Sequence, residues 1–127
     1  MGVARRYRGS FPCSASGARE ARREYVKFAA QRLSGRDLSD FETAIGEALA
    51  NAVEHSHAST LTVTGFDDGE RLVAEIRDDG RGFLPRLDIE PVRGALRGYG
   101  LYIMHQLLDE VEFSDDGRSL RLVKRLP

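Results

Sequence analysis

Apolar residues recur at intervals of three and four in two stretches of the first half of the chain, as on one face of an amphipathic helix. The first stretch opens at Ser14 or Ser16, both of a residue type that caps helices, and continues to about Leu33. The second opens at Ser39, which Glu42 follows at the spacing of a capping box. The apolar positions are Ala18, Ala21, Tyr25, Phe28 or Ala29, and Leu33 in the first stretch, and Phe41, Ile45, Ala48, Leu49, Ala52 and Val53 in the second. The pattern predicts two consecutive helices, each with one face on a core.

Other segments alternate apolar and polar residues, which is the period of a half-buried strand. Residues 5–11 are predicted to form an edge strand that ends at a proline. Two hairpins are predicted around Asp-Asp-Gly turns, one joining residues 61–66 to 72–76 and one joining 111–113 to 120–123.

The segment between the two hairpins divides into a loop and a helix. Residues 83–97 follow neither period and hold two prolines, so a long loop is expected there. A third helix is expected over residues 100–110. Its apolar face would be Leu101, Met104, Leu107 or Leu108, and Val111. The resulting order of strand, helix, helix, two strands, loop, helix and two strands is typical of an α+β two-layer sandwich with helices on one sheet face.

Composition sets the scale of this fold. The chain has 127 residues, of which 41% are hydrophobic and 31% charged, so a single domain over residues 1–127 is expected. Cys13 is the only cysteine, which excludes an internal disulfide framework. The sequence contains neither an apolar run long enough to span a bilayer nor a secretory signal pattern, so we expect a cytoplasmic protein with no membrane contact.

The small net charge of −1 hides an uneven distribution. Residues 1–36 carry a net charge of +7, whereas the remainder carries −8. The arginine-rich part could dock an acidic protein surface or the phosphates of a nucleic acid, but the acidic remainder would repel a long polyanion. A protein partner is therefore favoured over direct nucleic acid contact. The alternative is that Arg19, Arg22 and Arg23 form the solvated face of a helix.

Three polar residues of the second helix share one stripe. At about 100° per residue, Glu47, Asn51 and His55 lie along the edge of the apolar stripe rather than opposite it. A carboxylate and an amide at such an edge suit the floor of a pocket, because a core would exclude both groups. The alternative is that they are simply solvated.

A second group of residues follows the predicted strand 72–76. Asp78 is followed by Gly80 and Gly82, so a carboxylate stands at the strand end beside two glycines that allow the backbone to approach a flat ligand. An ionised carboxylate only accepts hydrogen bonds, which suits an exocyclic amine such as that of adenine. A tight turn with capping aspartates is the alternative.

A third group opens the third helix. Gly98, Tyr99, Gly100 and Leu101 stand where free backbone N–H groups and the positive end of the helix dipole favour phosphate, and Arg97 lies just upstream. The pattern is not a dinucleotide-binding fingerprint, because no strand directly precedes it and the third glycine is missing. A lone Gly-x-Gly after a disordered loop is the alternative.

The order and contexts of these groups resemble the GHKL (Bergerat) ATP-binding fold, which includes gyrase, histidine kinases and mismatch-repair ATPases. The three motifs read Glu47-Ala-Leu-Ala-Asn51-Ala-Val-Glu-His55, Ile76-Arg-Asp78-Asp-Gly80-Arg-Gly82-Phe83 and Gly98-Tyr-Gly100-Leu101. Within that superfamily the chain resembles the small bacterial anti-sigma-factor serine kinases over nearly its whole length. The resemblance implies a two-layer, histidine-kinase-like fold with a mixed sheet.

The resemblance also implies a role for each motif. Glu47 would be the general base, Asn51 would coordinate Mg²⁺ held with ATP, and Asp78 would accept from the adenine amino group. Loop 83–97 would close as a lid. Gly80 and Gly82 would line the purine pocket, and the phosphates would be held by Arg97, Gly98, Gly100 and Leu101. The resemblance also places His55 and Tyr99 among the nucleotide-binding residues.

The implied function is an ATP-dependent protein serine/threonine kinase that phosphorylates a serine of an anti-sigma antagonist and sequesters a sigma factor as a homodimer. Two departures from the family pattern stand out. Ser119 is the candidate substitute for a family threonine, and Glu54 replaces a residue that is often basic in histidine kinases. The alternatives are a nucleotide-gated binding module without kinase activity and a detached histidine-kinase-type catalytic domain.

Overall fold

The structure, a computed structural model, describes residues 5–55, 57–80, 99–115 and 118–127, and the order of its elements confirms the predicted one. The elements are β1 (Arg5–Pro12), α1 (Ala15–Ala29), α2 (Gly35–His55), β2 (Thr60–Asp67), β3 (Arg71–Asp78), α3 (Tyr99–Leu107), β4 (Glu110–Ser114) and β5 (Ser119–Arg125). The expected loop over 83–97 lies outside the described residues.

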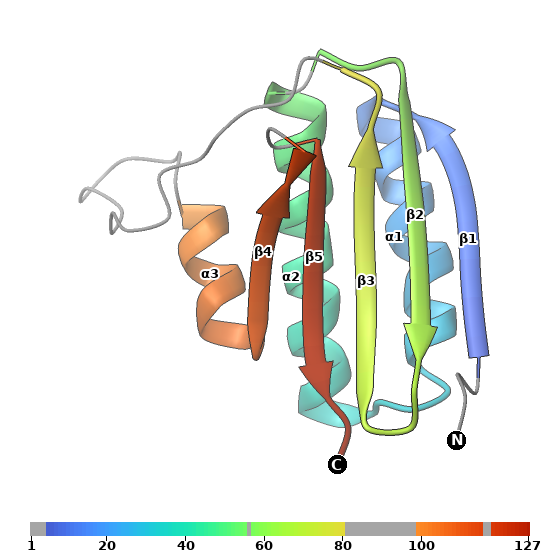
Figure 1. Ribbon diagram of the computed structural model, residues 1–127, viewed down its shortest axis with the longest axis vertical. Helices are drawn as coiled ribbons and strands as arrows, with labels where there is room; N and C mark the ends of the chain where they lie inside the picture. Colours follow the sequence, from blue (N-terminus) through green and yellow to red (C-terminus); the bar gives the residue numbers. More distant parts are fainter. Residues whose placement is uncertain (1–4, 56, 81–98, 116–117) are drawn as a thin grey trace.

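The five strands form one sheet in the order β1-β2-β3-β5-β4. All four neighbouring pairs are antiparallel, so the expectation of a mixed sheet is wrong for the described strands. Two successive helices return the chain from β1 to an antiparallel β2. Strands β3 and β4 run in the same direction, but β5 lies between them, so they do not pair with each other (Figure 1).

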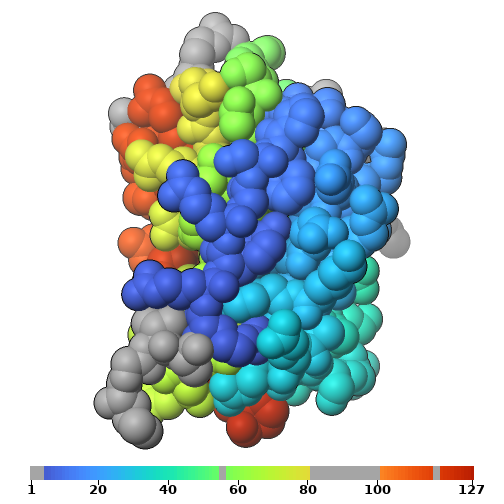
Figure 2. Space-filling model, turned by 90° about the vertical axis from the view of Figure 1, so that its right-hand side faces the viewer, coloured from blue at the N-terminus to red at the C-terminus, as the bar shows by residue number. Residues whose placement is uncertain are grey.

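The helices cover one face of this sheet, with α2 between α1 and α3 (Figure 1). Alternate strand residues point into the core, as the pattern predicts: Leu61 and Val63 on β2 are fully buried. Phe66 lies on the opposite face, because Gly65 and Asp67 take the inward positions at the end of β2. Figure 2 looks onto the edge formed by β1, which α1 flanks.

The start of α1 confirms one of the two predicted caps, whereas the other helix ends differ from the predicted ones. The side chain of Ser14 accepts a hydrogen bond from the Gly17 N–H at 3.1 Å, which identifies it as the cap of α1. Helix α1 ends at Ala29 rather than near Leu33, because the chain enters a turn there, although Leu33 stays buried.

The capping box predicted at Ser39 is wrong, since this residue lies inside α2. The Leu38 N–H already donates to the Ser34 carbonyl at 3.3 Å, and Asp37 supplies the acidic side chain of the first turn. Helix α3 ends at Leu107 instead of Glu110, because Asp109 pairs through its backbone N–H with Val123 of β5. None of the described helices is long and apolar enough to cross a membrane.

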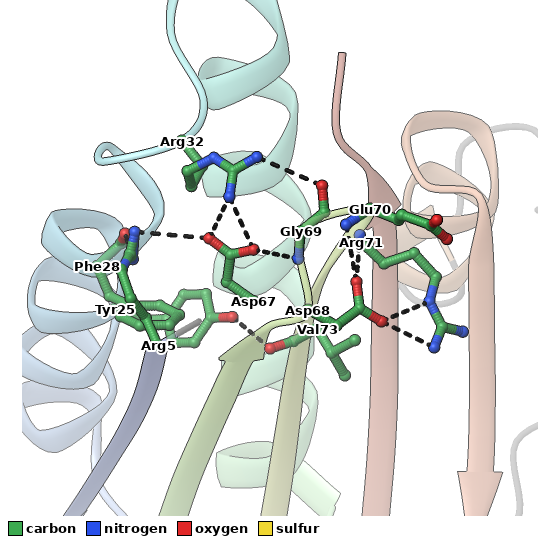
Figure 3. A network of polar contacts seen from close by, with 10 residues as sticks. All are labelled: Arg5, Tyr25, Phe28, Arg32, Asp67, Asp68, Gly69, Glu70, Arg71 and Val73. Carbon is green, nitrogen blue, oxygen red and sulfur yellow. Dashed lines mark hydrogen bonds and ion pairs between the residues drawn. The ribbon is translucent and has the colours of Figure 1, made fainter. Parts of the chain in front are cut away.

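A buried carboxylate ties three parts of the fold together at the end of β2 (Figure 3). The Asp67 side chain is fully buried and accepts two hydrogen bonds from the Arg32 guanidinium, at 2.7 and 2.9 Å. Arg5 of β1 lies 3.8 Å away from it and also donates to the Phe28 carbonyl at 2.7 Å. The Gly69 N–H donates to the same carboxylate and closes the β2–β3 turn. This network joins β1, the turn after α1 and the first hairpin.

The Tyr25 side chain fixes α1 on the sheet. Its hydroxyl donates to the Val73 carbonyl of β3 at 2.6 Å, and burial raises the pKa of this phenol. A Cβ on Gly65 would lie 2.5 Å from the Tyr25 ring and 2.8 Å from its hydroxyl oxygen. The absence of a side chain at position 65 therefore lets the tyrosine reach the backbone of β3.

We expect Gly65→Ala to destabilise the protein by about 1–3 kcal/mol, because the buried ring cannot move without losing its hydrogen bond. Gly46→Ala is the matched control: a Cβ there meets only the exposed, flexible Arg22 side chain at 3.2 Å. This second change should be neutral or stabilising, since alanine favours the interior of a helix over glycine by about 1 kcal/mol. Urea unfolding of both variants measures the difference, and equal stabilities would contradict it.

Candidate functional site

The site begins with a carboxylate at the end of β3. Asp78 is 8% exposed, and its side chain faces the helices because it continues the inward series of Ala74 and Ile76. Its Oδ1 accepts a hydrogen bond from the Gly80 N–H at 2.8 Å. Burial raises the pKa of this carboxyl, an effect that the Gly80 hydrogen bond opposes.

Asn51 of α2 lies at the same end of the sheet. Helix α2 and strand β3 run in the same direction, so their carboxyl ends meet (Figure 1). Asn51 and Asp78 line one small pocket, whose other walls are mostly apolar. The full lining is Ala48, Asn51, Ala52, Ile76, Asp78, Phe113, Arg118 and Leu120. The structure thus brings together two of the residues that the sequence singled out separately.

Arg118, which sequence reasoning did not assign to the site, also borders this pocket. Its backbone carbonyl accepts from the Asp78 N–H at 2.9 Å, so it stands directly opposite Asp78 in the sheet. Ser119, the candidate substitute for the family threonine, pairs with Arg77 and points to the other face, where its hydroxyl donates to Glu75 at 3.3 Å. The Ser119 hypothesis is therefore wrong for the described structure, because the strand register places Arg118 on the pocket side.

The neighbouring Asp79 has a structural role. Its carboxylate accepts from the Ser59 hydroxyl at 2.7 Å and from the backbone N–H groups of Ser59 and Thr60 at 2.9 and 3.0 Å. The hydrogen bond from the Ser59 hydroxyl has the largest effect on the pKa of the Asp79 carboxyl, and it and the two N–H groups all lower that pKa. Asp78 and Asp79 thus occupy opposite environments: one carboxylate lines a pocket and the other holds the start of β2.

The other predicted site residues either do not line the small pocket or lie outside the described residues. Glu47 lies half-buried on α2, one helical turn before Asn51, but it does not line the small pocket. His55 ends α2, and Tyr99 with Gly100 opens α3, which packs against α2. Leu101 is half-buried in the first turn of α3. The remaining predictions, Gly82, Arg97, Gly98 and the lid over 83–97, lie outside the described residues.

The chemistry of this arrangement is that of a recognition pocket for a flat, mostly apolar group with a hydrogen-bond donor. A nearly buried carboxylate at one wall accepts such a donor, while alanine, isoleucine, leucine and phenylalanine side chains supply apolar contact. The amide of Asn51 adds an oxygen that is able to ligate a divalent cation. These residue types suit the adenine amino group and a bound Mg²⁺, and the cavity, about 10 Å³ in this structure, has to widen to admit a purine.

Comparison with known proteins agrees with this description. A family model described as the histidine kinase-like ATPase domain matches residues 11–124. Among solved structures, the chain is similar to the RsbU and RsbW domains of Rv1364c from Mycobacterium tuberculosis, with 21% sequence identity and a TM-score of 0.72. This likeness covers 97% of the chain, which spans about a third (32%) of the solved one. Among curated proteins, none matches. Because the family model extends from the end of β1 into β5, the chain belongs to the histidine kinase-like ATPase domain family.

Proposed function

We propose that this protein is an ATP-binding anti-sigma regulatory factor that transfers the γ-phosphoryl group of ATP to a serine of an anti-sigma antagonist protein. One observation carries the proposal: Asn51 of α2 and Asp78 of β3 line the same apolar-walled pocket. Membership in an ATPase family supports ATP as the ligand.

In this proposal each residue has a defined task. Asp78 accepts the adenine amino group, and Gly80 and Gly82 allow the backbone to approach the purine. Asn51 holds Mg²⁺, which when bound neutralises charge on the phosphates. Glu47 accepts the proton of the serine hydroxyl. The remaining nucleotide contacts are assigned to His55, Arg97, Gly98, Tyr99, Gly100 and Leu101.

The proposed partners are a sigma factor and its anti-sigma antagonist, bound by a homodimer. The likeness to a solved chain with an RsbW domain supports the choice of this regulatory system. The uneven charge of the sequence, +7 over residues 1–36 and −8 over the rest, favours protein partners over nucleic acid. A nucleotide-gated binding module without transfer is the second candidate, because it needs the pocket but not Glu47.

The pocket assignment predicts a large loss of affinity in Asp78→Asn. We expect the affinity for a non-hydrolysable ATP analogue to fall about ten- to a hundredfold, the effect of removing a hydrogen bond to a charged group. The thermal stability should stay the same or rise, since a carboxyl whose pKa is raised by folding opposes folding once it is ionised. Calorimetric titration and thermal melts measure the two effects.

Asp79→Asn is the matched control, because it changes the adjacent carboxylate in the same way. Its contacts hold the start of β2, so we expect a lower melting temperature with analogue affinity close to that of the wild type. Wild-type affinity in Asp78→Asn would remove the proposed contact with adenine.

A further inference from the structure

Arg118 connects the start of β5 with the turn after β3. Its Nε donates to the Gly80 carbonyl at 2.9 Å, and its backbone carbonyl accepts from the Asp78 N–H at the same distance. The Gly80 N–H donates in turn to the Asp78 carboxylate at 2.8 Å. Three hydrogen bonds therefore form a closed ring through Asp78, Gly80 and Arg118.

The guanidinium of Arg118 is itself held from the opposite side. Its Nη1 donates to the Asp115 carbonyl at 3.3 Å and lies 3.5 Å from the Asp115 carboxylate. Asp115 also forms an ion pair with Arg77 of β3 at 2.7 Å. The turn between β4 and β5 thus fixes Arg118, and Arg118 fixes the backbone that orients the Asp78 carboxylate.

We propose that Arg118 is a positioning residue for nucleotide recognition: by holding the Gly80 carbonyl, it keeps the Asp78 carboxylate aimed into the pocket as an acceptor for the base. The inference rests on the proposed function and deepens it. Asp78 would contact adenine, whereas Arg118 would hold the Asp78 carboxylate in the orientation that this contact needs.

The charges around Asp78 support this assignment. The charged groups acting on its carboxyl are Asp79, Arg118 and Arg77, whereas the pocket walls from α2 and β4 contribute Ala48, Asn51, Ala52 and Phe113, which are uncharged. Burial and Asp79 raise the pKa of Asp78, while the two arginines lower it. Removing Arg118 takes away a cation next to a nearly buried carboxylate. The carboxyl would then take up its proton at a higher pH and lose the negative charge that strengthens the hydrogen bond from the base.

The test is a calorimetric titration of the whole chain with a non-hydrolysable ATP analogue from about pH 4, the ordinary range of an aspartate, to about pH 8. In the wild type, binding should weaken as the pH falls and Asp78 is protonated. In Arg118→Met, we expect about five- to tenfold weaker binding at neutral pH, the scale of one lost hydrogen bond. The acid limb, which is the part of the pH profile where binding weakens as the pH falls, should move to higher pH. Arg118→Lys keeps the charge and should restore the position of the limb.

Arg121→Met is the control, because Arg121 lies on β5, which follows Arg118, but pairs with Glu75 on the other face of the sheet. It should leave both affinity and pH profile unchanged. Wild-type affinity together with a wild-type pH profile in Arg118→Met would overturn the inference. A loss of affinity that leaves the pH profile unchanged, and that Arg118→Lys does not reverse, would also overturn it. If methionine prevents folding, the lysine variant decides: a limb displaced despite the retained charge overturns the inference. Absence of binding in the wild type would overturn the proposed function and the inference together, whereas the other outcomes concern Arg118 alone.

Discussion

Glu47→Gln should bind ATP as the wild type does and transfer phosphate at least about a hundredfold more slowly, the range expected for removal of a general base. Glutamine keeps the size and hydrogen-bonding reach of the side chain but does not accept a proton. Glu47 lies one helical turn before Asn51 and outside the small pocket, so the change should leave nucleotide affinity intact. Incorporation of labelled γ-phosphate into candidate antagonist proteins, together with an analogue titration, measures both effects.

Glu42→Gln provides the matched control on the same helix. Glu42 is half-buried like Glu47 but lies nearer the start of α2, away from Asn51, so transfer should proceed at the wild-type rate. Undiminished transfer by Glu47→Gln would exclude this residue as the base. ATP binding by the wild type without transfer to any antagonist would instead favour the nucleotide-gated binding module.

Asp67→Ala should cost about 3 kcal/mol of folding free energy, the lower end of the cost of breaking a buried ion pair. The carboxylate is fully buried between the partly exposed guanidinium groups of Arg5 and Arg32. Its removal leaves two cations facing each other and frees the Gly69 N–H of the β2–β3 turn (Figure 3). Denaturant unfolding should show this loss, and the melting temperature should fall by roughly 10 °C.

The adjacent Asp68 is the control for this prediction. Its carboxylate is 24% exposed and accepts from the backbone N–H groups of Glu70 and Arg71, which lowers its pKa. Asp68→Ala should therefore destabilise the protein much less than Asp67→Ala. Equal losses in the two variants would show that the turn, rather than the buried ion pair, stabilises this corner of the fold.

Local sequence signals predicted the order of the elements and singled out Asn51 and Asp78 as candidates for one site. The Asp-Asp-Gly turn and the flanking alternation predicted the hairpin of β2 and β3, because the turn and the strand period are both local properties. The helical period placed Asn51 at the edge of an apolar stripe, and the strand period placed Asp78 at a strand end. The structure then brings these two residues to one pocket.

Features that depend on pairing between distant segments could not be predicted in this way. Arg118 faces the pocket because of the register between β3 and β5. Its contact with Gly80 joins residues that are 38 positions apart in the sequence. The Ser119 hypothesis came from the family threonine, without knowledge of that register. The antiparallel sheet has the same origin, since the insertion of β5 between β3 and β4 is not encoded in any one segment. The false capping box at Ser39 shows that a local motif yields to the turn that precedes it.

The central claim, that the pocket between α2 and β3 binds ATP with Mg²⁺, is tested most directly by calorimetric titration of the wild-type protein with a non-hydrolysable ATP analogue, with and without Mg²⁺. The account predicts saturable binding that strengthens when Mg²⁺ is present, because Asn51 holds the metal together with the nucleotide. Failure to bind the analogue at millimolar concentration, with Mg²⁺ present, would contradict the account.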